Sequence, residues 1–435
     1  MNAKPYPKYK ASGVEWLGDV PEHWTVKGAS KGFEIQLGKM LQPDAGDKED
    51  LEVPYLKSQH VQWERVRVEE PPQMWASPRD VMKYGIRDGD LLVCEGGDVG
   101  RAAIVRKPEP QTIIQNALHR VRSSDNNDVR FLMRVLEHAS AQDWFSILCN
   151  RSTIAHFTSE KFGALTVPFP PPAEQQAIAD FLDERTEKLD GLLGKKRELI
   201  GKLKEKRSAL ISRTVTKGLP PEAAAKVGLT PNPKLKPSGI SWLGDIPEHW
   251  EVVSVRYAFY NLDFRRIPIA GEDRAYVEKK YPYYGASGII DHVENYIFDE
   301  TLILVAEDGA NLLSRSSPLA FLAQGKYWVN NHAHILKPIS GDIRFWVQVL
   351  ATYDYSPLVS GAAQPKLTSD RLGGTRVPQP PCEEQAAIAN FLEGETSQID
   401  RMIQKVETAI EKLTEYRTAL ITAAVTGKID VRKKR

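Results

Sequence analysis

The sequence predicts an α/β (α+β) protein in which two globular mixed α/β modules are separated by two long helices. Three observations lead to this fold class: an internal repeat, two long proline-free segments with heptad spacing, and short apolar runs punctuated by turn residues. A chain of 435 residues is long enough for about three domains at roughly 150 residues each. We therefore expect an internal pseudo-twofold repeat whose two helices pair as an antiparallel coiled coil.

The repeat is visible as matched segments in the two halves of the chain. SGVEWLGDVPEHWTV recurs 226 residues later as SGISWLGDIPEHWEV, and two further pairs recur at an offset of 210. Between the matched ends the two copies diverge, so each copy is a common frame around a variable filling. Simple drift after duplication would blur frame and filling alike, and we therefore favour one scaffold that presents two different binding surfaces. The matched pairs are residues 12–26 with 238–252, 167–182 with 377–392, and 207–216 with 417–426.

The frame contains the long helices. No proline occurs from Ala173 to Thr216, and Pro171 and Pro172 stand just before this segment, where a helix tolerates them. About 44 helical residues would extend ~66 Å at 1.5 Å per residue. Apolar residues recur at heptad spacing in both copies, which predicts a coiled-coil seam formed with the other copy. The predicted seam residues are Leu182, Leu189, Leu192, Leu199, Leu203, Leu210, Leu392, Ile399, Met402, Val406, Leu413 and Leu420.

The fillings read as strands and turns that end in a helix. Short apolar runs at Leu91–Cys94, Ala102–Val105 and Leu302–Ala306 predict strands, and the stretches Val129–Cys149 and Asp342–Ala351 predict helices. A segment rich in Pro, Lys and Ala before residue 238 predicts a linker. The expected organisation is a first module at 1–166, a long helix at 167–218, a linker at 219–237, a second module at 238–376, a long helix at 377–427 and a basic tail at 428–435.

The charge, the cysteines and the lack of long apolar runs exclude several classes of protein. The formal net charge is +1, which excludes a strongly basic or acidic chain as a global description but not a local basic face. Residues 195–217 hold nine basic and two acidic side chains, which fits either a solvated helical face or a surface near phosphates or an acidic partner. The three cysteines are far apart, which argues against a disulfide framework and fits a reducing cytoplasm. The N-terminus lacks an apolar core and no apolar run is long enough for a bilayer, so we expect neither a signal peptide nor contact with a membrane.

No catalytic motif is present. The chain has no G-x-x-x-x-G-K-[ST] loop for ATP and no N-P-P-[FY] tetrapeptide for amino-methyl transfer. The glycine-rich segment 95–101 is followed by an apolar run rather than a helix, which predicts a hairpin turn and not a phosphate site. His332 and His334 lack further ligands nearby, so we expect a hydrogen-bonding role and no metal site. We therefore predict no catalytic residues, no metal and no cofactor in this chain.

The remaining polar, basic and aromatic residues favour contact with double-stranded DNA. Arg, Lys, Gln and Asn read base edges in the major groove, and Arg, Lys, Tyr and Ser bind phosphates. The candidates in the first module are Lys57, Ser58, Gln59, His60, Arg65, Arg67, Arg79, Lys83 and Tyr84. The candidates in the second module are Arg265, Arg266, Lys279, Lys280, Tyr281, Tyr283, Tyr284, Ser287, Asn311 and Arg315.

With these residues in view, the chain resembles the specificity subunits of type I restriction-modification systems. The likeness rests on Trp16–Trp24 and its repeat Trp242–Trp250, and on the Pro-rich runs before Glu174-Gln175-Gln176-Ala-Ile-Ala and Glu384-Gln385-Ala-Ala-Ile-Ala. It covers the whole chain in the order variable, frame, variable, frame.

The resemblance implies a non-catalytic subunit with two target-recognition domains, each reading one half of a split, asymmetric DNA site. It also implies two methyltransferase subunits docked on the long helices and motor-nuclease subunits that cut, with AdoMet, Mg²⁺ and ATP bound by those partners. The base contacts of the family follow no transferable motif, so the candidates above rest on residue type. The alternative is a coiled-coil adaptor with two protein-binding modules.

Overall fold

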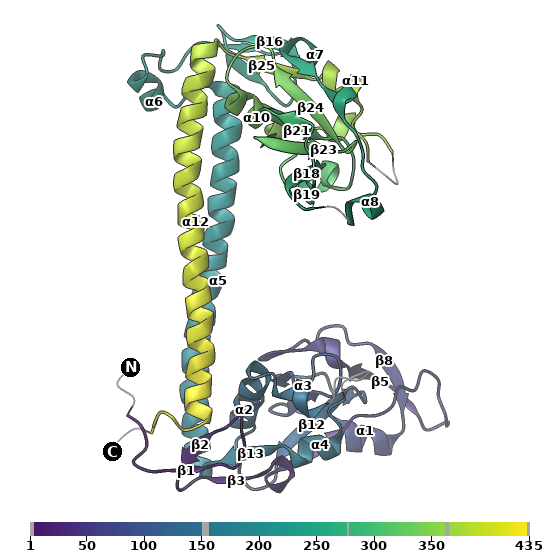
Figure 1. Ribbon diagram of the computed structural model, residues 1–435. Coiled ribbons are helices and arrows are strands. Elements are labelled where there is room, and N and C mark those ends of the chain that lie inside the picture. Colours follow the sequence, from purple (N-terminus) through teal and green to yellow (C-terminus); the bar gives the residue numbers. More distant parts are fainter. Residues whose placement is uncertain (1–3, 150–155, 276–277, 362–364, 433–435) are drawn as a thin grey trace. The chain divides into compact units, whose positions relative to one another are not determined.

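The structure, a computed structural model, describes residues 4–149, 156–275, 278–361 and 365–432 (Figure 1). It divides into two compact units. Unit 1 comprises Met1–Lys196 with Glu407–Arg435, and unit 2 comprises Arg197–Val406. Each unit therefore holds one module together with part of each long helix, and the core of each unit includes side chains from both helices.

Unit 1 is built on two small sheets. The first is antiparallel with strand order β10-β9-β12-β4, and the second has the order β11-β5-β8 with β11 parallel to β5. Further antiparallel pairs are β1 with β2, β3 with β13 and β6 with β7. The strands are β1 (Tyr9–Ala11), β2 (Asp19–Pro21), β3 (Thr25–Gly28), β4 (Phe33–Leu37), β5 (Leu51–Leu56), β6 (Val61–Gln62), β7 (Arg65–Val66), β8 (Gln73–Ala76), β9 (Leu91–Cys94), β10 (Ala102–Ile104), β11 (Ile113–Ile114), β12 (Leu118–Ser123) and β13 (Thr166–Phe169).

The short helices of unit 1 fill the spaces around these sheets. The expected helix at Val129–Cys149 is two helices, because Asp143 adopts a left-handed backbone with φ of 54° that ends one and precedes the next. The glycine-rich segment after β9 is a hairpin turn, as predicted, since β9 and β10 pair antiparallel. The helices are η1 (Ala29–Lys31), η2 (Ser58–His60), α1 (Pro78–Tyr84), α2 (Val129–Ala141), α3 (Trp144–Leu148) and α4 (Ser159–Ala164).

Unit 2 repeats this topology. Its first sheet has the order β17-β24-β21-β22, and its second sheet places β18 between antiparallel β19 and parallel β23, with β20 at the edge. The strands are β14 (Leu235–Pro237), β15 (Asp245–Pro247), β16 (Glu251–Ser254), β17 (Phe259–Asn261), β18 (Tyr281–Gly285), β19 (Gly288–Val293), β20 (Phe298–Asp299), β21 (Leu302–Ala306), β22 (Ala320–Ala323), β23 (Lys326–Val329), β24 (Ala333–Pro338) and β25 (Arg376–Gln379). The helices are α6 (Pro221–Lys226), α7 (Val255–Ala258), η3 (Asp263–Arg265), α8 (Gly271–Ala275), α9 (Asn311–Ser314), α10 (Ile343–Thr352), η4 (Ser356–Leu358) and α11 (Ser369–Gly374).

The long helices are α5 (Pro172–Lys217) and α12 (Cys382–Val425). Each begins directly after prolines and carries glutamates in its first turn, which suits the positive end of the helix dipole. The long helices expected at 167–218 and 377–427 begin later than predicted, because the first residues of both ranges belong to the strands β13 and β25, whose prolines cannot continue a helix. Among the described residues, no helix is both long and apolar enough to cross a membrane.

The two long helices run antiparallel within each unit. In unit 1 Arg417 Nε of α12 lies 3.0 Å from Asp190 Oδ1 of α5, and Leu182 near the start of α5 shares a core with Leu420 near the end of α12. In unit 2 Arg207 Nε lies 2.9 Å from Asp400 Oδ1.

Nine of the twelve predicted seam residues face inward, and three do not. The row of Leu182, Leu189, Leu203 and Leu210 faces inward, as does the row of Leu392, Ile399, Val406, Leu413 and Leu420. The second row lies one residue later than predicted, at Thr186, Leu193 and Ile200 on α5 and at Ile403 and Ile410 on α12. Leu192, Leu199 and Met402 are accordingly 48%, 43% and 42% exposed. The spacing alone could not choose, because polar Thr186 occupies an inward position and leucines occupy outward ones.

A buried glutamine at the start of each long helix fixes the module to it. The Gln175 amide accepts from the backbone N–H of Asp128 at 3.0 Å and donates to the Pro170 carbonyl at 2.8 Å. Asp128 caps α2 by accepting from Arg130 N. The same contacts recur in unit 2, where Gln385 accepts from Asp342 N at 3.2 Å and donates to Pro380 O at 2.9 Å. Both glutamines have no exposed surface, so each is a buried hydrogen-bonded link between module and helix.

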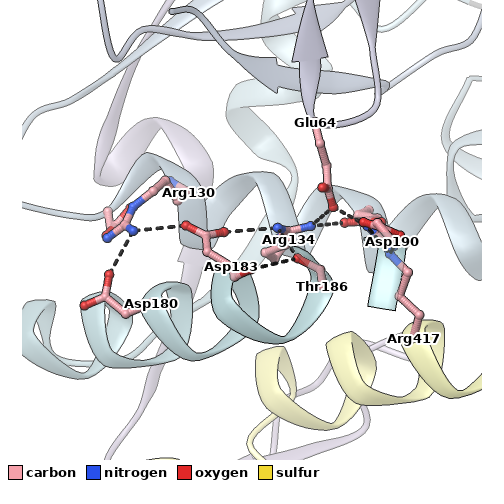
Figure 2. A network of polar contacts seen from close by, with 10 residues as sticks. Glu64, Arg130, Arg134, Asp180, Asp183, Thr186, Asp190 and Arg417 are labelled. Atoms are coloured by element: carbon pink, nitrogen blue, oxygen red, sulfur yellow. Dashed lines mark hydrogen bonds and ion pairs between the residues drawn. The ribbon is translucent and has the colours of Figure 1, made fainter. Parts of the chain in front are cut away.

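Unit 1 adds a network of charges between the module and both long helices (Figure 2). Arg134 of α2 is 2% exposed and contacts Glu64 of the module, Asp183 at 3.0 Å and the Thr186 hydroxyl at 3.0 Å. Burial favours a lower pKa for Arg134, but the carboxylates of Glu64 and Glu137 outweigh it and raise that pKa.

The network continues onto α12. Arg417 contacts Glu64, lies 2.5 Å from Glu137 Oε1 and reaches Asp190. Burial likewise favours a lower pKa for Arg417, and Glu137 leads the groups that raise it. Arg130 joins the same network through Asp183 and Asp180. Glu64, three residues of α2 and both long helices are thus tied together by charge-assisted hydrogen bonds.

Unit 2 has, among its described residues, the equivalents of the Arg130–Asp183 and Arg417–Asp190 pairs. Arg344 reaches Glu393 at 2.7 Å and Arg207 reaches Asp400, but Gln348 stands where unit 1 has Arg134, four residues after the equivalent arginine. Gln348 lines a hollow of about 890 Å³ between α5 and α10. The two modules are therefore joined to their helices with different numbers of ionic contacts.

We predict that Gln175→Ala and Gln385→Ala each destabilise the chain by about 1–3 kcal/mol, because each leaves a buried backbone N–H and carbonyl without a partner. Urea unfolding monitored by circular dichroism measures this. Gln176→Ala is the matched control, since the neighbouring Gln176 is exposed and should change the free energy of unfolding by less than about 0.5 kcal/mol. Equal effects at 175 and 176 would contradict the proposed link.

We predict that Arg134→Gln, which introduces the residue found in the second module, destabilises unit 1 by about 1–3 kcal/mol because Glu64 and Asp183 lose a buried partner. Adding Glu64→Gln should recover part of this loss, with a coupling of at least about 0.5 kcal/mol in a double-mutant cycle. Strict additivity of the two substitutions in thermal unfolding would show that the two residues do not act together.

Candidate nucleic-acid interface

In unit 1 the predicted residues on α1 lie on an open surface. The Ser77 hydroxyl caps α1 by accepting from Asp80 N at 3.2 Å, and Lys39 Nζ holds Asp80 at 2.8 Å. Arg79 and Lys83 of this helix are exposed, whereas Tyr84 is half-buried below the Lys83 ammonium, which lies 5.1 Å from the ring centroid. Met82 on the same helix is 84% exposed and was not predicted. This face presents two cations and an apolar side chain to a ligand.

The segment around η2 is only partly available. Gln59 is exposed, and the Ser58 carbonyl is held by Arg101 Nη2 at 3.1 Å. His60 is 8% exposed and its Nδ1 accepts from Lys57 N at 2.9 Å. Burial lowers the pKa of His60, so the ring stays neutral and braces the turn. The assignment of His60 as a DNA contact is therefore wrong.

Arg65 and Arg67 lie beside this turn on and after β7. Both are exposed, and Arg65 lies 3.5 Å from Glu69 in a pair that is itself exposed. Exposed pairs of this kind contribute little to stability, which leaves both guanidinium groups accessible to an anionic ligand.

In unit 2 an exposed cluster combines aromatic rings and lysines. The rings of Tyr281 and Tyr296 meet edge to face at 5.1 Å between centroids. Lys280 lies 5.4 Å from the centroid of Tyr281, and Lys326 lies 4.6 Å from that of Tyr296. We call Lys280, Tyr281, Tyr296 and Lys326 the tyrosine–lysine cluster. Such a surface can contact phosphates through its ammonium groups and sugars or bases through its rings.

Sequence reasoning found half of this cluster. Tyr296 and Lys326 were missed because they lie 15 and 45 residues beyond Tyr281 and come together only through the sheet, in which β18 and β23 are parallel neighbours. The one sequence feature that could have pointed to Lys326 is the lysine–tyrosine pair, which occurs at both 280–281 and 326–327.

Several other candidates in unit 2 are engaged inside the module. Tyr283 is 1% exposed and its hydroxyl accepts from Ile269 N at 3.0 Å. Arg266 donates to the Ala333 carbonyl at 2.9 Å and contacts Glu307. The assignment of Tyr283 and Arg266 as DNA contacts is therefore corrected to a structural role. Their polar groups are already hydrogen-bonded to carboxylates and backbone groups that lie elsewhere in the sequence.

Most of the other second-module candidates contact neighbouring residues of the same unit, and Ser287 is exposed. Arg265 lies over Phe298 at 4.3 Å and pairs with Glu300 at 3.2 Å, and Lys279 pairs with Asp291 at 2.7 Å. Asn311 holds the turn at Ser317, and the Arg315 guanidinium donates to the last carbonyls of α10. Tyr284 is half-buried and stacks on Phe321, whereas Ser287 is exposed at the β18–β19 turn.

His334, one of the paired histidines, has the hydrogen-bonding role that the sequence predicts. His334 is 1% exposed, and its Nδ1 and Nε2 lie 2.6 Å from Asp263 Oδ2 and 2.8 Å from the Leu367 carbonyl. Among the residues that the structure describes, no group of three or more His, Cys, Asp or Glu is placed to hold a metal ion.

Comparison with known proteins identifies the fold and the family. Across most of its length the chain is 22% identical to a putative type I restriction enzyme MjaX specificity subunit of Methanocaldococcus jannaschii, with 96% of each chain covered. A shorter match, 34% identical over 122 residues, is to the putative specificity subunit S.HindORF215P of Haemophilus influenzae and covers 28% of this chain and 31% of that one.

Two solved structures share the fold. One, described as the structural basis underlying complex assembly and conformational transition of the type I R-M system, has a TM-score of 0.68 at 14% identity and covers 94% of this chain and 99% of its own. The HsdS subunit from Thermoanaerobacter tengcongensis has a TM-score of 0.50 at 16% identity, with 94% and 98% covered.

The family model for the type I restriction modification DNA specificity domain matches residues 33–200 and again residues 247–413. The two matches cover most of the chain and coincide with the two copies of the internal repeat. The protein therefore belongs to the family of type I restriction-modification specificity subunits and carries two copies of its DNA specificity domain.

Proposed function

We propose that this chain is the non-catalytic DNA-reading subunit of a type I restriction-modification complex. In this role its two modules are target-recognition domains that read the two halves of a split, asymmetric site in double-stranded DNA. The observation that carries the proposal is the pair of family matches on two modules of the same topology whose exposed side chains differ. The family favours this role over that of a coiled-coil adaptor between proteins.

The differing surfaces give a physical reason for an asymmetric target. Unit 1 offers a short helix with Arg79, Met82 and Lys83 exposed, which suits entry into a groove and contact with base edges or thymine methyl groups. Unit 2 offers the tyrosine–lysine cluster on strand and turn residues. Two such surfaces would prefer different bases, because their donors and apolar groups differ in kind and position.

The exposed row on the long helices supports docking of partner helices. Leu192 in unit 1 and Leu199 and Met402 in unit 2 each keep more than two fifths of their surface exposed. Apolar side chains at heptad spacing on an outer helix face are suited to a further helix in a bundle. We infer that two methyltransferase subunits dock here, that motor-nuclease subunits join them in the cytoplasm, and that AdoMet, Mg²⁺ and ATP are bound by those partners.

We predict that Lys280→Gln and Lys326→Gln each weaken binding to all duplex sequences alike and lower the slope of log affinity against log salt by about one, because each removes one phosphate contact. Fluorescence anisotropy with the reconstituted methyltransferase complex measures the slope. Lys234→Gln is the control, since Lys234 is an exposed lysine beside β14. An unchanged slope in both variants would exclude the cluster from the DNA interface.

We predict that Leu192→Lys leaves the chain folded but weakens its association with the methyltransferase subunit at least tenfold, because the added charge would be buried in the complex. Sedimentation velocity of the mixed subunits measures the association. Leu189→Lys, at the buried neighbouring position, should instead lower the free energy of unfolding of the isolated chain. Undiminished association of the Leu192 variant would place the docking surface elsewhere.

A further inference from the structure

A glutamate in the first turn of each long helix, Glu174 in α5 and Glu384 in α12, occupies equivalent places in the two units but has different partners. In unit 1 Glu174 is 5% exposed, and its carboxylate accepts from Tyr6 Oη at 2.6 Å and Trp24 Nε1 at 2.9 Å. His23 Nε2 lies 2.9 Å from its other oxygen. Arg432 completes the site, with Nη1 3.8 Å from Glu174 Oε2 and its guanidinium 4.9 Å from the centroid of Tyr6. The carboxylate is thus fully enclosed by hydrogen bonds, a cation and aromatic rings.

In unit 2 the equivalent carboxylate keeps only one of these partners. Glu384 is 6% exposed and contacts His249 Nε2 at 2.7 Å through Oε2. Within the described part of the chain, no hydrogen bond reaches its Oε1. Trp250 is fully buried, and its Nε1, the counterpart of the Trp24 donor, has no hydrogen-bond partner among the described residues. A buried donor without an acceptor, such as Trp250 Nε1, is costly, and Glu384 Oε1 receives no donor from the described part of the chain.

The missing partners follow from the sequence. The backbone N–H of Glu22 donates to Lys8 O, and that of Glu248 donates to Lys234 O, so the strands before each motif share one register. That register places Asn232 where unit 1 has Tyr6. After α5 the chain turns at Gly218 into α6, whereas after α12 it continues as Ile429-Asp-Val-Arg432 over Glu174. Unit 2 therefore has no counterpart of the tyrosine or of the arginine.

A hollow of about 450 Å³ remains beside Glu384. Its walls combine the acidic Glu383 and Glu384 with apolar side chains such as Leu219 and Leu229, and Lys217 and His249 also line it. A Cβ placed on Gly218, which also lines the hollow, would lie 3.4 Å from Glu384 Oε1, so this oxygen lies close to its wall. The neighbouring Lys217 ammonium is already bonded to the Asp245 carbonyl. Apolar walls beside a carboxylate with one oxygen lacking a donor suit the aliphatic stem and planar cation of arginine.

We propose that the hollow beside Glu384 is a binding site for an arginine side chain of another polypeptide, which takes the place that Arg432 holds in unit 1. The bound guanidinium donates to Glu384 Oε1. The arginine comes from a different protein because the chain's own Arg432 is engaged on Glu174. The site is independent of DNA binding, so its test does not depend on the proposed function.

The probe is the acetylated and amidated peptide Ile-Asp-Val-Arg, which copies residues 429–432, titrated into the full chain by isothermal calorimetry. A second peptide carries citrulline, the uncharged isostere, in place of arginine. We expect saturable binding of the arginine peptide and at least tenfold weaker binding of the citrulline peptide. Equal binding of the two peptides would overturn the assignment of a guanidinium site.

Variants locate the binding to unit 2. Glu384→Gln should lower the affinity for the arginine peptide at least tenfold. Glu251→Gln, which removes one exposed negative charge from the same unit, should change this affinity less than threefold. Circular dichroism confirms that each variant is folded. Undiminished binding of the arginine peptide by the Glu384→Gln variant would overturn the proposal. Self-association of the wild-type chain in sedimentation, if Glu384→Gln abolishes it, would also overturn the proposal, because the partner would then be a second copy of this chain.

Discussion

Both modules of this protein depend on one buried hydrogen-bonded link, the amide of Gln175 or Gln385 at the first turn of a long helix. Each amide accepts from the backbone N–H of the residue that caps α2 or α10 and donates to a proline carbonyl just before the long helix. Because proline has no N–H, that carbonyl lies in a segment that cannot extend the helix. The side chain thus fixes the chain direction at the point where module, strand and long helix meet.

Around this shared link the two units have diverged in how tightly the module is attached. Unit 1 surrounds the joint with a charge network that includes Arg134, Glu64 and Arg417. Unit 2 replaces the central arginine with Gln348 and leaves open space beside it. Buried ion pairs often add more to specificity of arrangement than to stability. The difference between the two units is consistent with modules that keep one frame while their surfaces and attachments vary.

The sequence predicted most of the architecture and little of the contact surface. The repeat, the long helices and strands such as β9 and β21 depend on local pattern, and the structure confirms them. The second row of the helix seam was displaced by one residue, because polar Thr186 occupies an inward position while Leu192 points outward. His60, Arg266 and Tyr283 were candidates by residue type alone, and their partners lie in folded contacts that composition cannot reveal. Tyr296 and Lys326 were missed for the same reason, since strand pairing brings them to Tyr281.

In the proposed function, each module reads one half of a divided DNA site independently of the other. The most direct measurement is methylation-sensitive genome sequencing of a host that expresses this chain with its methyltransferase subunit, compared with a hybrid chain in which residues 27–166 come from a relative of different specificity. We expect a two-part modified sequence in which the exchange alters one half and preserves the other. A change in both halves, or in neither, would contradict it.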